Sequence, residues 1–586
     1  MLENPPSRSP QFLRLVMFVL LLLAGRSAQA QSPALSVSGA DDELSRNIRS
    51  LVALPSEPCD ASLARLNRFL PAARQQVIRA ARALGYYQIQ QQTRFVAGGT
   101  CWGLEVAVQP GPPVLIGNID IEVSSAPERF RSVLSSLPLS SGERLNHGRY
   151  EQVKSALSGQ AIENGFFDAR FDSAELRVDL ERNLADVIIR FNPGEQYRFG
   201  EVQIQQLDAL DDGFMRRYIG IEPGTPYSSE AMIELRNTLN NSQYFGNVSV
   251  SPSLDRTSDG MVPLQVALQL RPRRVYGVGI GATTDIGPRV RLDYSDRYIN
   301  RSGHKIEMQS AASPIQQVID LNYIIPMWDP ATQSLRISSG FLQENFDTYQ
   351  SQTTKLGLAY SHSSLLGFQQ NEFVNYQHDE FRFERRDGPT DKTVSDLLIL
   401  GTNVTRTQAD DAIQPRRGWR FFAQVRGASD AFLSTNSFAQ FYLSGKAVIG
   451  LGRGRILGRF EFGTSLVDEL ESIPASVQFF AGGDQSVRGY AFQSLGPTDV
   501  EGNTLGGKHL AATSVEYDFP LTGNWKAAMF LDAGNSFNKY DEYTARKGAG
   551  IGIRWLSPIG PVRVDLASAL DEDNRLRLHI TMGPDL

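Results

Sequence analysis

Cysteine and histidine are scarce in this chain, which has two Cys and six His among 586 residues. Structural metal sites are commonly built from clusters of these residues, so we expect no metal and no other cofactor. A large excess of one charge sign is also missing, because 58 basic and 64 acidic side chains leave a formal net charge of only −6. Nucleic-acid-binding domains usually carry a basic excess, and this balance argues against that class.

Long apolar runs are missing after the first 30 residues. A helix that spans a bilayer needs about 20 mostly apolar residues, so the sequence predicts no spanning helix in the mature chain. Gly and aromatic residues are plentiful, with 51 Gly, 31 Phe and 19 Tyr, and 41% of the chain is hydrophobic, which excludes a disordered protein. One class of membrane protein stays open, the β-barrel, whose strands are apolar on only one face.

The first 30 residues have the pattern of a secretory signal peptide. Arg8 and Arg14 supply a positively charged region before an apolar stretch at 15–25, and Ala28 and Ala30 fit the small-residue cleavage rule. The alternative is a membrane anchor, but this stretch is too short to span a bilayer. We therefore expect export of the chain after cleavage behind Ala30.

The two cysteines, Cys59 and Cys101, both lie near the start of the mature chain. In an exported protein, a pair with no third Cys most simply forms one disulfide. Closing the loop between them would contribute roughly 4 kcal/mol in the chain-entropy model. The alternative is two unpaired thiols.

A weak threefold repeat occupies residues 33–272. Each unit has an amphipathic helical stretch, then an aromatic turn, then a strand that runs into a proline, and the glycines Gly85 and Gly165 of the first two turns are 80 residues apart. A fixed repeat length, with turn and proline residues at matching positions, indicates tandem copies of one small domain. Helical and alternating patterns in each unit predict an α+β fold with helices on one face of a short sheet. The free edge of such a sheet can accept a strand from another chain.

The sequence pattern changes at residue 273, and we expect no helix after this point. Runs of alternating polarity recur between Gly, Asn, Asp and Pro clusters, and in 576–582 Leu, Ile and Met alternate with Arg, His and Thr. A soluble sandwich would show similar alternation, but more than 300 residues of such strands are too many for one dry core. A closed barrel with lipid outside and water inside satisfies every backbone group. At about 20 residues per strand and connection, the segment predicts an all-β transmembrane barrel of about 16 antiparallel strands.

Enzyme signatures are absent from the sequence. No His-Glu-x-x-His, Gly-x-Ser-x-Gly or Walker loop occurs. Gly277, Gly279 and Gly281 alternate along an expected strand and open no helix, so they form no dinucleotide-binding loop. The six His are scattered, and we expect each to be solvated or to face a barrel lumen. The sequence therefore does not predict an enzyme.

The segment 480–490 (FAGGDQSVRGY) carries the most informative motif. Its Val-Arg-Gly-Tyr resembles the Val-Arg-Gly-Phe/Tyr loop signature of the outer-membrane insertase superfamily that includes BamA and TamA. Segments 514–517 (SVEY), 530–534 (FLDAG) and 550–563 (GIGIRWLSPIGPVR) resemble strands of the same family. The resemblance covers essentially the whole mature chain, and the units of the repeat have the size of the family's POTRA domains.

The resemblance implies a domain plan that agrees with the patterns. We expect a signal peptide at 1–30, POTRA-like repeats at 31–112, 113–195 and 196–272, and the barrel at 273–586. The barrel would lie in the cell outer membrane, with the repeats in the periplasm.

Alternation places Glu516 and Asp532 on the lumen face of two neighbouring strands. Two such carboxylates need a counter-charge, and Arg488, in a Gly-flanked loop, can bind both through its planar fork of donors. Gly489 permits unusual backbone dihedral angles in that turn, and Tyr490 is the next residue. The resemblance implies the same contact between loop and wall. The alternative is an ordinary extracellular loop with a solvated Arg.

The seam between the first and last strands is a candidate gate. Gly277, Gly279 and Gly281 weaken packing in the first strand, and the last ends in Gly583 and Pro584, where Pro584 cannot donate a ladder hydrogen bond. A client strand could pair with an edge exposed there, and the family's proposed lateral gate lies at this place. Equally, the glycines could accommodate barrel curvature.

The resemblance implies an outer-membrane assembly factor that helps insert and fold β-barrel and autotransporter proteins, as the TamA-like subunit of a translocation and assembly module. Three repeats and the ending MGPDL resemble the TamA branch, whereas BamA-like chains carry five repeats and end in an aromatic residue. The implied partners are a periplasm-spanning TamB-type protein, unfolded outer-membrane clients and outer-membrane lipid.

Two other functions remain as alternatives. A two-partner-type protein secretion pore shares the loop motif, but such pores typically carry two repeats and a plugging N-terminal helix, which residues 31–45 do not offer. A passive porin would not need three periplasmic domains.

Overall fold

The computed structural model describes residues 32–204, 207–364, 366–384, 388, 390–499, 502–557, 560–572, 576–583 and 585. The expected signal peptide and Pro584 lie outside these residues. The chain forms two compact units, of which the first holds the first two domains and the second holds most of the third domain and the barrel. No described helix is both long enough and apolar enough to cross a membrane.

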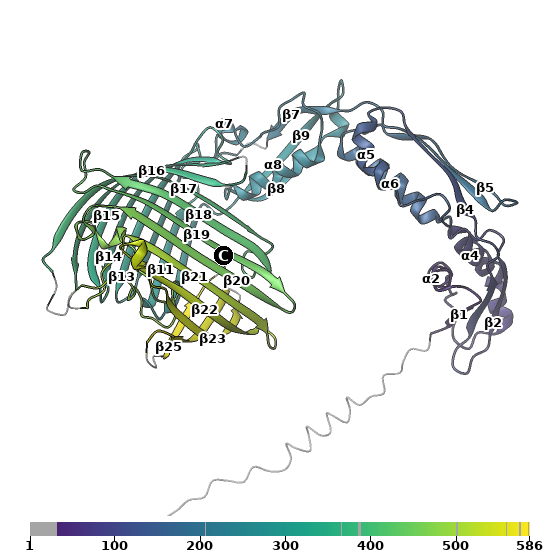
Figure 1. Ribbon diagram of the computed structural model, residues 1–586. Coiled ribbons are helices and arrows are strands. Elements are labelled where there is room, and N and C mark those ends of the chain that lie inside the picture. The colour runs from purple at the N-terminus through teal and green to yellow at the C-terminus, as the bar shows by residue number, and fades with distance from the viewer. Residues whose placement is uncertain are drawn as a thin grey trace, which may run out of the picture. The chain divides into compact units, whose positions relative to one another are not determined.

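Three small domains with one architecture follow each other along the chain (Figure 1). In each, a first strand leads into helices, two further strands follow, and the last strand lies in the middle of a three-stranded sheet, in the orders β1-β3-β2, β4-β6-β5 and β7-β9-β8. The strands are β1 Ala34–Ser38, β2 Gln90–Val96, β3 Gly103–Gln109, β4 Leu115–Val123, β5 Arg170–Asp179, β6 Leu184–Asn192, β7 Arg198–Ile204, β8 Phe245–Pro252 and β9 Met261–Leu270. The helices are α2 Asp42–Leu51, α3 Leu63–Leu66, α4 Leu70–Ala83, α5 Arg131–Ser135, α6 His147–Glu163, α7 Asp212–Arg216 and α8 Ser229–Asn241, with short 3-10 turns η1 Asn67–Phe69, η2 Pro127–Phe130 and η3 Leu254–Arg256.

Apolar stripes on the helices form the core of each domain. In α6, Tyr150, Val153, Leu157 and Ala161 are all buried against the sheet, because their spacing of three and four residues puts them on one helix face. In the first domain, Cys59 and Cys101 form a disulfide, with a sequence separation of 42. These domains therefore combine helix-on-sheet packing with one covalent link.

Sixteen strands of the C-terminal region form one antiparallel sheet in sequence order, from β10 to β25 (Figure 1). The prediction of an all-β barrel of about 16 antiparallel strands is confirmed. The first eight are β10 Arg274–Thr283, β11 Gly287–Asp296, β12 Lys305–Ala312, β13 Gln316–Pro326, β14 Gln333–Asn345, β15 Tyr349–Ser363, β16 Gln369–Phe383 and β17 Thr393–Ala409. The others are β18 Arg417–Ala428, β19 Phe438–Leu451, β20 Gly454–Leu466, β21 His509–Pro520, β22 Trp525–Phe537, β23 Arg546–Ser557, β24 Gly560–Ala569 and β25 Leu576–Met582.

Each barrel strand has one apolar outer face and one largely polar inner face. In β22, Met529 and Leu531 point outward and are 54% and 64% exposed, whereas Asp532 points inward and is 3% exposed. The only described helical turns in this region are η4 Leu470–Ser472, η5 Ala475–Val477 and η6 Tyr540–Glu542. They lie in connections between strands, so they interrupt no part of the wall.

The third domain contacts the barrel at the turn between β11 and β12. The Tyr244 hydroxyl donates to the carbonyl oxygen of Gly303 at 2.5 Å, and the Asp211 N–H donates to the carbonyl of Arg301 at 2.8 Å. Both acceptors lie in the turn between β11 and β12. That end of the barrel is also where β10 begins, directly after the third domain in the sequence.

Candidate loop-to-wall clamp and seam

The connection between β20 and β21 folds into the barrel instead of leaving it. Five of its apolar residues are buried and pack against the wall residues Leu510 and Ala569. The five are Phe479, Ala481, Val487, Tyr490 and Leu495. We call this connection, residues 467–508, the inner loop.

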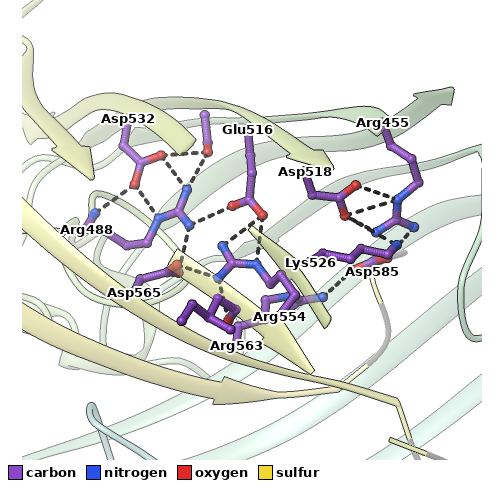
Figure 2. Close-up of polar contacts among 12 residues, drawn as sticks. Arg455, Arg488, Glu516, Asp518, Lys526, Asp532, Arg554, Arg563, Asp565 and Asp585 are labelled. Atoms are coloured by element: carbon purple, nitrogen blue, oxygen red, sulfur yellow. Dashed lines mark hydrogen bonds and ion pairs between the residues drawn. The ribbon is translucent and has the colours of Figure 1, made fainter. Parts of the chain in front are cut away.

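Arg488 joins the inner loop to three strands of the wall (Figure 2). Its Nε and Nη2 donate to the two carboxylate oxygens of Asp532 at 2.8 and 3.0 Å. Its Nη1 donates to Glu516 at 2.8 Å and to Asp565 at 3.0 Å. The structure thus brings Arg488, Glu516 and Asp532 together, and it adds Asp565 of β24, which sequence reasoning missed.

Arg554 of β23 is the second cation of this cluster, and sequence reasoning missed it too. It donates to Glu516 at 2.8 and 3.0 Å and to Asp565 at 2.5 Å. Alternation along β23 and β24 puts both Arg554 and Asp565 on the lumen face, so a search for all lumen-facing charges would have found them. We call Arg488, Arg554, Glu516, Asp532 and Asp565 the clamp.

The clamp is almost completely removed from solvent. The side chains of Arg488, Arg554 and Asp532 are 8%, 2% and 0% exposed. Asp532 also accepts hydrogen bonds from the Arg488 backbone N–H at 3.0 Å and from Ser514 Oγ at 2.6 Å. Charges buried this deeply are stable only when every partner is present, and removal of one typically costs about 3–5 kcal/mol. The cluster is therefore suited to hold the inner loop in place, and its carboxylates are saturated by donors.

Gly489 and Tyr490 fix the backbone next to the clamp. Gly489 has φ +99°, and a Cβ there would lie 2.8 Å from backbone atoms of Ser568 and Ala569. The Gly489 N–H donates to His579 Nε2 at 3.0 Å. The Tyr490 hydroxyl donates to Asp571 at 3.3 Å. Only glycine fits the closest approach of this turn to the wall.

A second cluster holds the end of the chain inside the barrel (Figure 2). Asp585, three residues after β25, accepts from Arg455 at 3.0 Å and from Arg563 at 2.5 Å. Arg455 also donates to Asp518 at 3.1 Å, and Lys526 lies 3.7 Å from the same carboxylate. The side chain of Asp585 is 2% exposed, so the chain end is pinned by buried ion pairs.

Asp285, Asp484 and His579 form the one group with metal-like spacing among the described residues. His579 Nε2 accepts from Gly489, so Nδ1 carries the proton and donates to Asp484 Oδ1 at 2.5 Å. Both imidazole nitrogens are then used by protein partners, and neither offers a lone pair to a metal ion. The group fits a polar link between the inner loop and β25 better than a metal site.

The seam between β10 and β25 is sparsely bonded. Among the described residues, two hydrogen bonds join Ile580 of β25 to Thr284, the residue directly after β10, from the Thr284 N–H to the Ile580 carbonyl at 3.3 Å and from the Ile580 N–H to Thr284 Oγ1 at 3.2 Å. By contrast, β24 and β25 pair continuously from Val562 with Met582 to Ser568 with Leu576. The edge of β10 is therefore free along most of its length.

The seam glycines lie apart from the clamp. Gly277, Gly279 and Gly281 are at the alternate, lumen-facing positions of β10, while the side chains of Val278 and Ile280 between them point outward and are 75% and 81% exposed. A Cβ at Gly281 would meet no atom within 4 Å. Gly583 follows β25 with φ +142°. The inner face of β10 thus presents almost no side-chain bulk at the seam.

Comparison with known proteins gives the family. A model described as the Omp85 superfamily domain matches residues 278–585, one described as POTRA domain TamA domain 1 matches 34–110, and a POTRA model described as surface antigen variable number repeat matches 197–269. Outer membrane protein assembly factor BamA of Nitratidesulfovibrio vulgaris is 22% identical over 490 residues, which cover 80% of this chain and 61% of that protein. BamA of Neisseria meningitidis serogroup B is 22% identical over 518 residues, which cover 74% and 62%. The chain therefore spans about three fifths of the length of these relatives.

A solved structure supports the fold. The crystal structure of BamA from Haemophilus ducreyi lacking POTRA domains 1–3 superposes with a TM-score of 0.65 at 16% identity, over 80% of this chain and 99% of that one. A barrel of this kind behind POTRA domains lies in the outer membrane, and its N-terminal domains lie in the periplasm. The end of the barrel where β10 begins is accordingly the periplasmic end.

Proposed function

The chain belongs to the Omp85 superfamily, whose model matches more than half of its residues, and on this premise we propose that it is an outer-membrane assembly factor. It helps insert and fold β-barrel proteins, including autotransporter-type clients, in the outer membrane. We further propose that it does so as the TamA-like subunit of a translocation and assembly module. The match of residues 34–110 to a TamA-type first POTRA domain supports this branch, as do three α+β domains in front of the barrel.

The sparse seam is the observation that carries the proposal. A strand edge with unpaired N–H and C=O groups is a template for another strand. Among the described residues, Thr284 and Ile580 make the only direct hydrogen bonds across the seam, and Asp484 of the inner loop bridges Thr284 and His579. A client strand can therefore pair with β10 at the cost of few existing hydrogen bonds. The client then folds strand by strand at the edge and enters the bilayer sideways.

The clamp has a supporting part in this mechanism. It holds the inner loop across the lumen while the seam changes, because Arg488 bonds to β21, β22 and β24, and β25 bears His579, which the loop also contacts. No covalent step is required, and we propose that the protein is not an enzyme. A loop clamped to the inner wall also favours an insertase over a permanently open secretion pore.

Cross-linking the seam tests the proposal. Thr284→Cys combined with Ile580→Cys places thiols on residues whose backbones already hydrogen-bond. The matched control joins Ala423→Cys and Leu443→Cys, a directly opposed pair inside the continuous ladder of β18 and β19. Proteoliposomes containing each oxidised variant are given an unfolded autotransporter barrel, whose insertion is followed by its heat-modifiable migration on gels.

We expect the oxidised seam variant to lose most insertion activity and to regain it after reduction, while the control keeps its activity in both states. Full activity with a quantitatively oxidised seam would overturn the gate. An inventory of outer-membrane barrels after depletion of this protein then identifies the clients, and an unchanged inventory would argue against an assembly role.

We also propose a periplasm-spanning TamB-type partner that docks on the POTRA domains. Deleting residues 32–112 should abolish its co-purification while the barrel still folds. Retention of the partner by the shortened chain would move the docking site to the later domains.

A further inference from the structure

An apolar groove crosses the outer wall of the barrel over β18, β19 and β20. Its open floor is formed by Ala447 and Gly458, which have no side chain beyond a methyl group, whereas the ring of Phe460 lies over Gly445. Phe421 and Phe460 border one side of it, and the groove has a volume of about 530 Å³. A Cβ at Gly458 would meet no atom within 4 Å, so the floor lies open to the outside.

The strand register places this groove on the membrane side. Phe421, Gly445 and Phe460 are directly opposed across three strands, and so are Trp419, Ala447 and Gly458. The residues between them, Arg420, Lys446 and Arg459, belong to the inner face. In an outer-membrane barrel the outward face is covered by lipid, so the surroundings of the groove are membrane.

Tryptophan positions give the depth of the groove in the bilayer. Four of the five Trp lie at the periplasmic end of the barrel: Trp328 in the turn after β13, Trp419 and Trp525 within the first three residues of β18 and β22, and Trp555 near the end of β23. Aromatic girdles mark the membrane interface of such barrels. Because Trp419 also lines the groove, the groove begins at the headgroup level of the periplasmic leaflet.

An arginine side chain on the outward face of the barrel stands beside the groove. Arg406, directly opposed to Phe421 on the outward face of β17, has its guanidinium 5.3 Å from the ring centre of Phe368 and 5.4 Å from that of Trp419. Phe368 and Trp419 are themselves groove residues. Within the described residues Arg406 makes no hydrogen bond or ion pair, whereas Arg488 is saturated by carboxylates.

We propose that this groove binds one glycerophospholipid of the periplasmic leaflet, with an acyl chain on the floor of Ala447 and Gly458 beside Phe460 and the phosphate on Arg406. A guanidinium binds phosphate through two parallel donors, and the two aromatic rings orient its plane. The side-chain stem of Arg406 can lie along the wall while its head stays at the interface. Lipopolysaccharide occupies the opposite leaflet, and the periplasmic depth of Trp419 therefore selects a phospholipid.

Native mass spectrometry of the full chain tests the proposal. Protein stripped of lipid in detergent is titrated with phosphatidylglycerol and, separately, with a diacylglycerol of the same chains. Arg406→Gln removes the cation, and Gly458→Phe fills the floor. Arg336→Gln is the matched control, because Arg336 lies near the periplasmic end of β14 on the lumen face. Heat-modifiable migration checks that every variant is folded.

We expect wild-type protein and Arg336→Gln to retain one phosphatidylglycerol with equal affinity. Arg406→Gln should bind it about 10-fold more weakly, with diacylglycerol binding unchanged, and Gly458→Phe should weaken both lipids. Equal retention of phosphatidylglycerol by wild type, Arg406→Gln and Gly458→Phe would overturn the site. The site would also be overturned if wild-type protein retained only detergent. In that case the groove would be a binding surface for a membrane-embedded partner. Neither outcome bears on client insertion, so this site and the proposed function fail independently.

Discussion

Arg488 and Asp532 contact each other through three hydrogen bonds, two from the guanidinium at 2.8 and 3.0 Å and one from the Arg488 backbone N–H at 3.0 Å. One residue belongs to a loop and the other to the wall, and 44 residues separate them in the sequence. The pair determines both the position of the loop backbone and the direction of the side chain. The clamp is therefore a geometric lock as well as a charge pair.

Substitution of Arg488 tests that lock. Arg488→Ala leaves Glu516 and Asp565 paired with Arg554 and removes the cation that is paired with Asp532, and we expect a loss of about 3–5 kcal/mol in barrel stability, together with reduced client insertion. Arg488→Lys should rescue poorly, because an ammonium group cannot bridge three carboxylates in a plane. Denaturant titration of the folded band on gels measures the loss. Arg453→Ala, at an exposed Arg in the turn between β19 and β20, is the control, and full stability and activity in both Arg488 variants would refute the clamp.

Gly489→Ala should release the inner loop without removing a charge. The residue has φ +99°, and an added methyl group would collide with the backbone of Ser568 and Ala569. We expect a cost of at least about 1–3 kcal/mol and protease cleavage within residues 467–508. Gly452→Ala is the matched control, since Gly452 also has positive φ but an added Cβ there meets nothing within 4 Å. Equal protease resistance of the two variants would contradict this reading of the turn.

Asp585→Asn should loosen the last strand. Asp585 is held by Arg455 and Arg563, and loss of hydrogen bonds to charged groups costs about 1.5–3 kcal/mol. We therefore expect amide hydrogens of residues 576–582 to exchange at least about 10-fold faster, with the clamp strands unaffected. Hydrogen exchange with mass spectrometry measures this, and Asp541→Asn, in the exposed turn η6, serves as control. Unchanged exchange would mean that the ladder to β24 alone holds β25.

The contact between the first two domains should depend on pH. His147 Nε2 lies 2.7 Å from the Tyr87 hydroxyl, and burial lowers the pKa of His147 below its usual value, although Glu151 acts in the opposite direction. A lowered folded-state pKa favours the neutral imidazole, so its contribution to stability is complete above the unfolded pKa of about 6.5 and falls as pH drops below it. Thermal unfolding of a fragment with the first two domains should show a decline between about pH 7 and 5. His147→Gln should flatten that decline, and an equally steep decline in the variant would assign it to other groups.

Removal of the disulfide should affect one domain only. Cys59→Ser opens the loop to Cys101 and should destabilise the first domain by about 2–4 kcal/mol, because the unfolded chain regains conformational freedom. Calorimetry of the N-terminal domains should show one transition at lower temperature, while the heat-modifiable barrel is unchanged. Melting of the first domain at the wild-type temperature would show that the bridge contributes nothing.

The fold followed from local patterns. The spacing of Tyr150, Val153 and Leu157 predicted a helix on a sheet, and strict alternation in segments such as 576–582 predicted strands with two unlike faces. These patterns determine secondary structure and face, because the helix period of 3.6 and the strand period of 2 are properties of the backbone itself. The number of strands followed from length alone, since each crossing of a bilayer needs a similar stretch of chain.

The composition of the sites depends on which residues the folded barrel brings into contact. Alternation placed Glu516 and Asp532 on the lumen face, and the motif around Arg488 indicated their counter-charge. The contacts of Asp565 and Arg554 with the clamp, however, depend on how the sheet curves into a barrel and on how far the inner loop reaches into it. The ion pairs of Asp585, the hydrogen bonds at the seam and the position of Arg406 between two aromatic rings likewise depend on register across strands. A sequence specifies which side of its own strand a residue faces, whereas the neighbour it meets is set by strand order, shear and the path of a loop, and only the tertiary structure determines these.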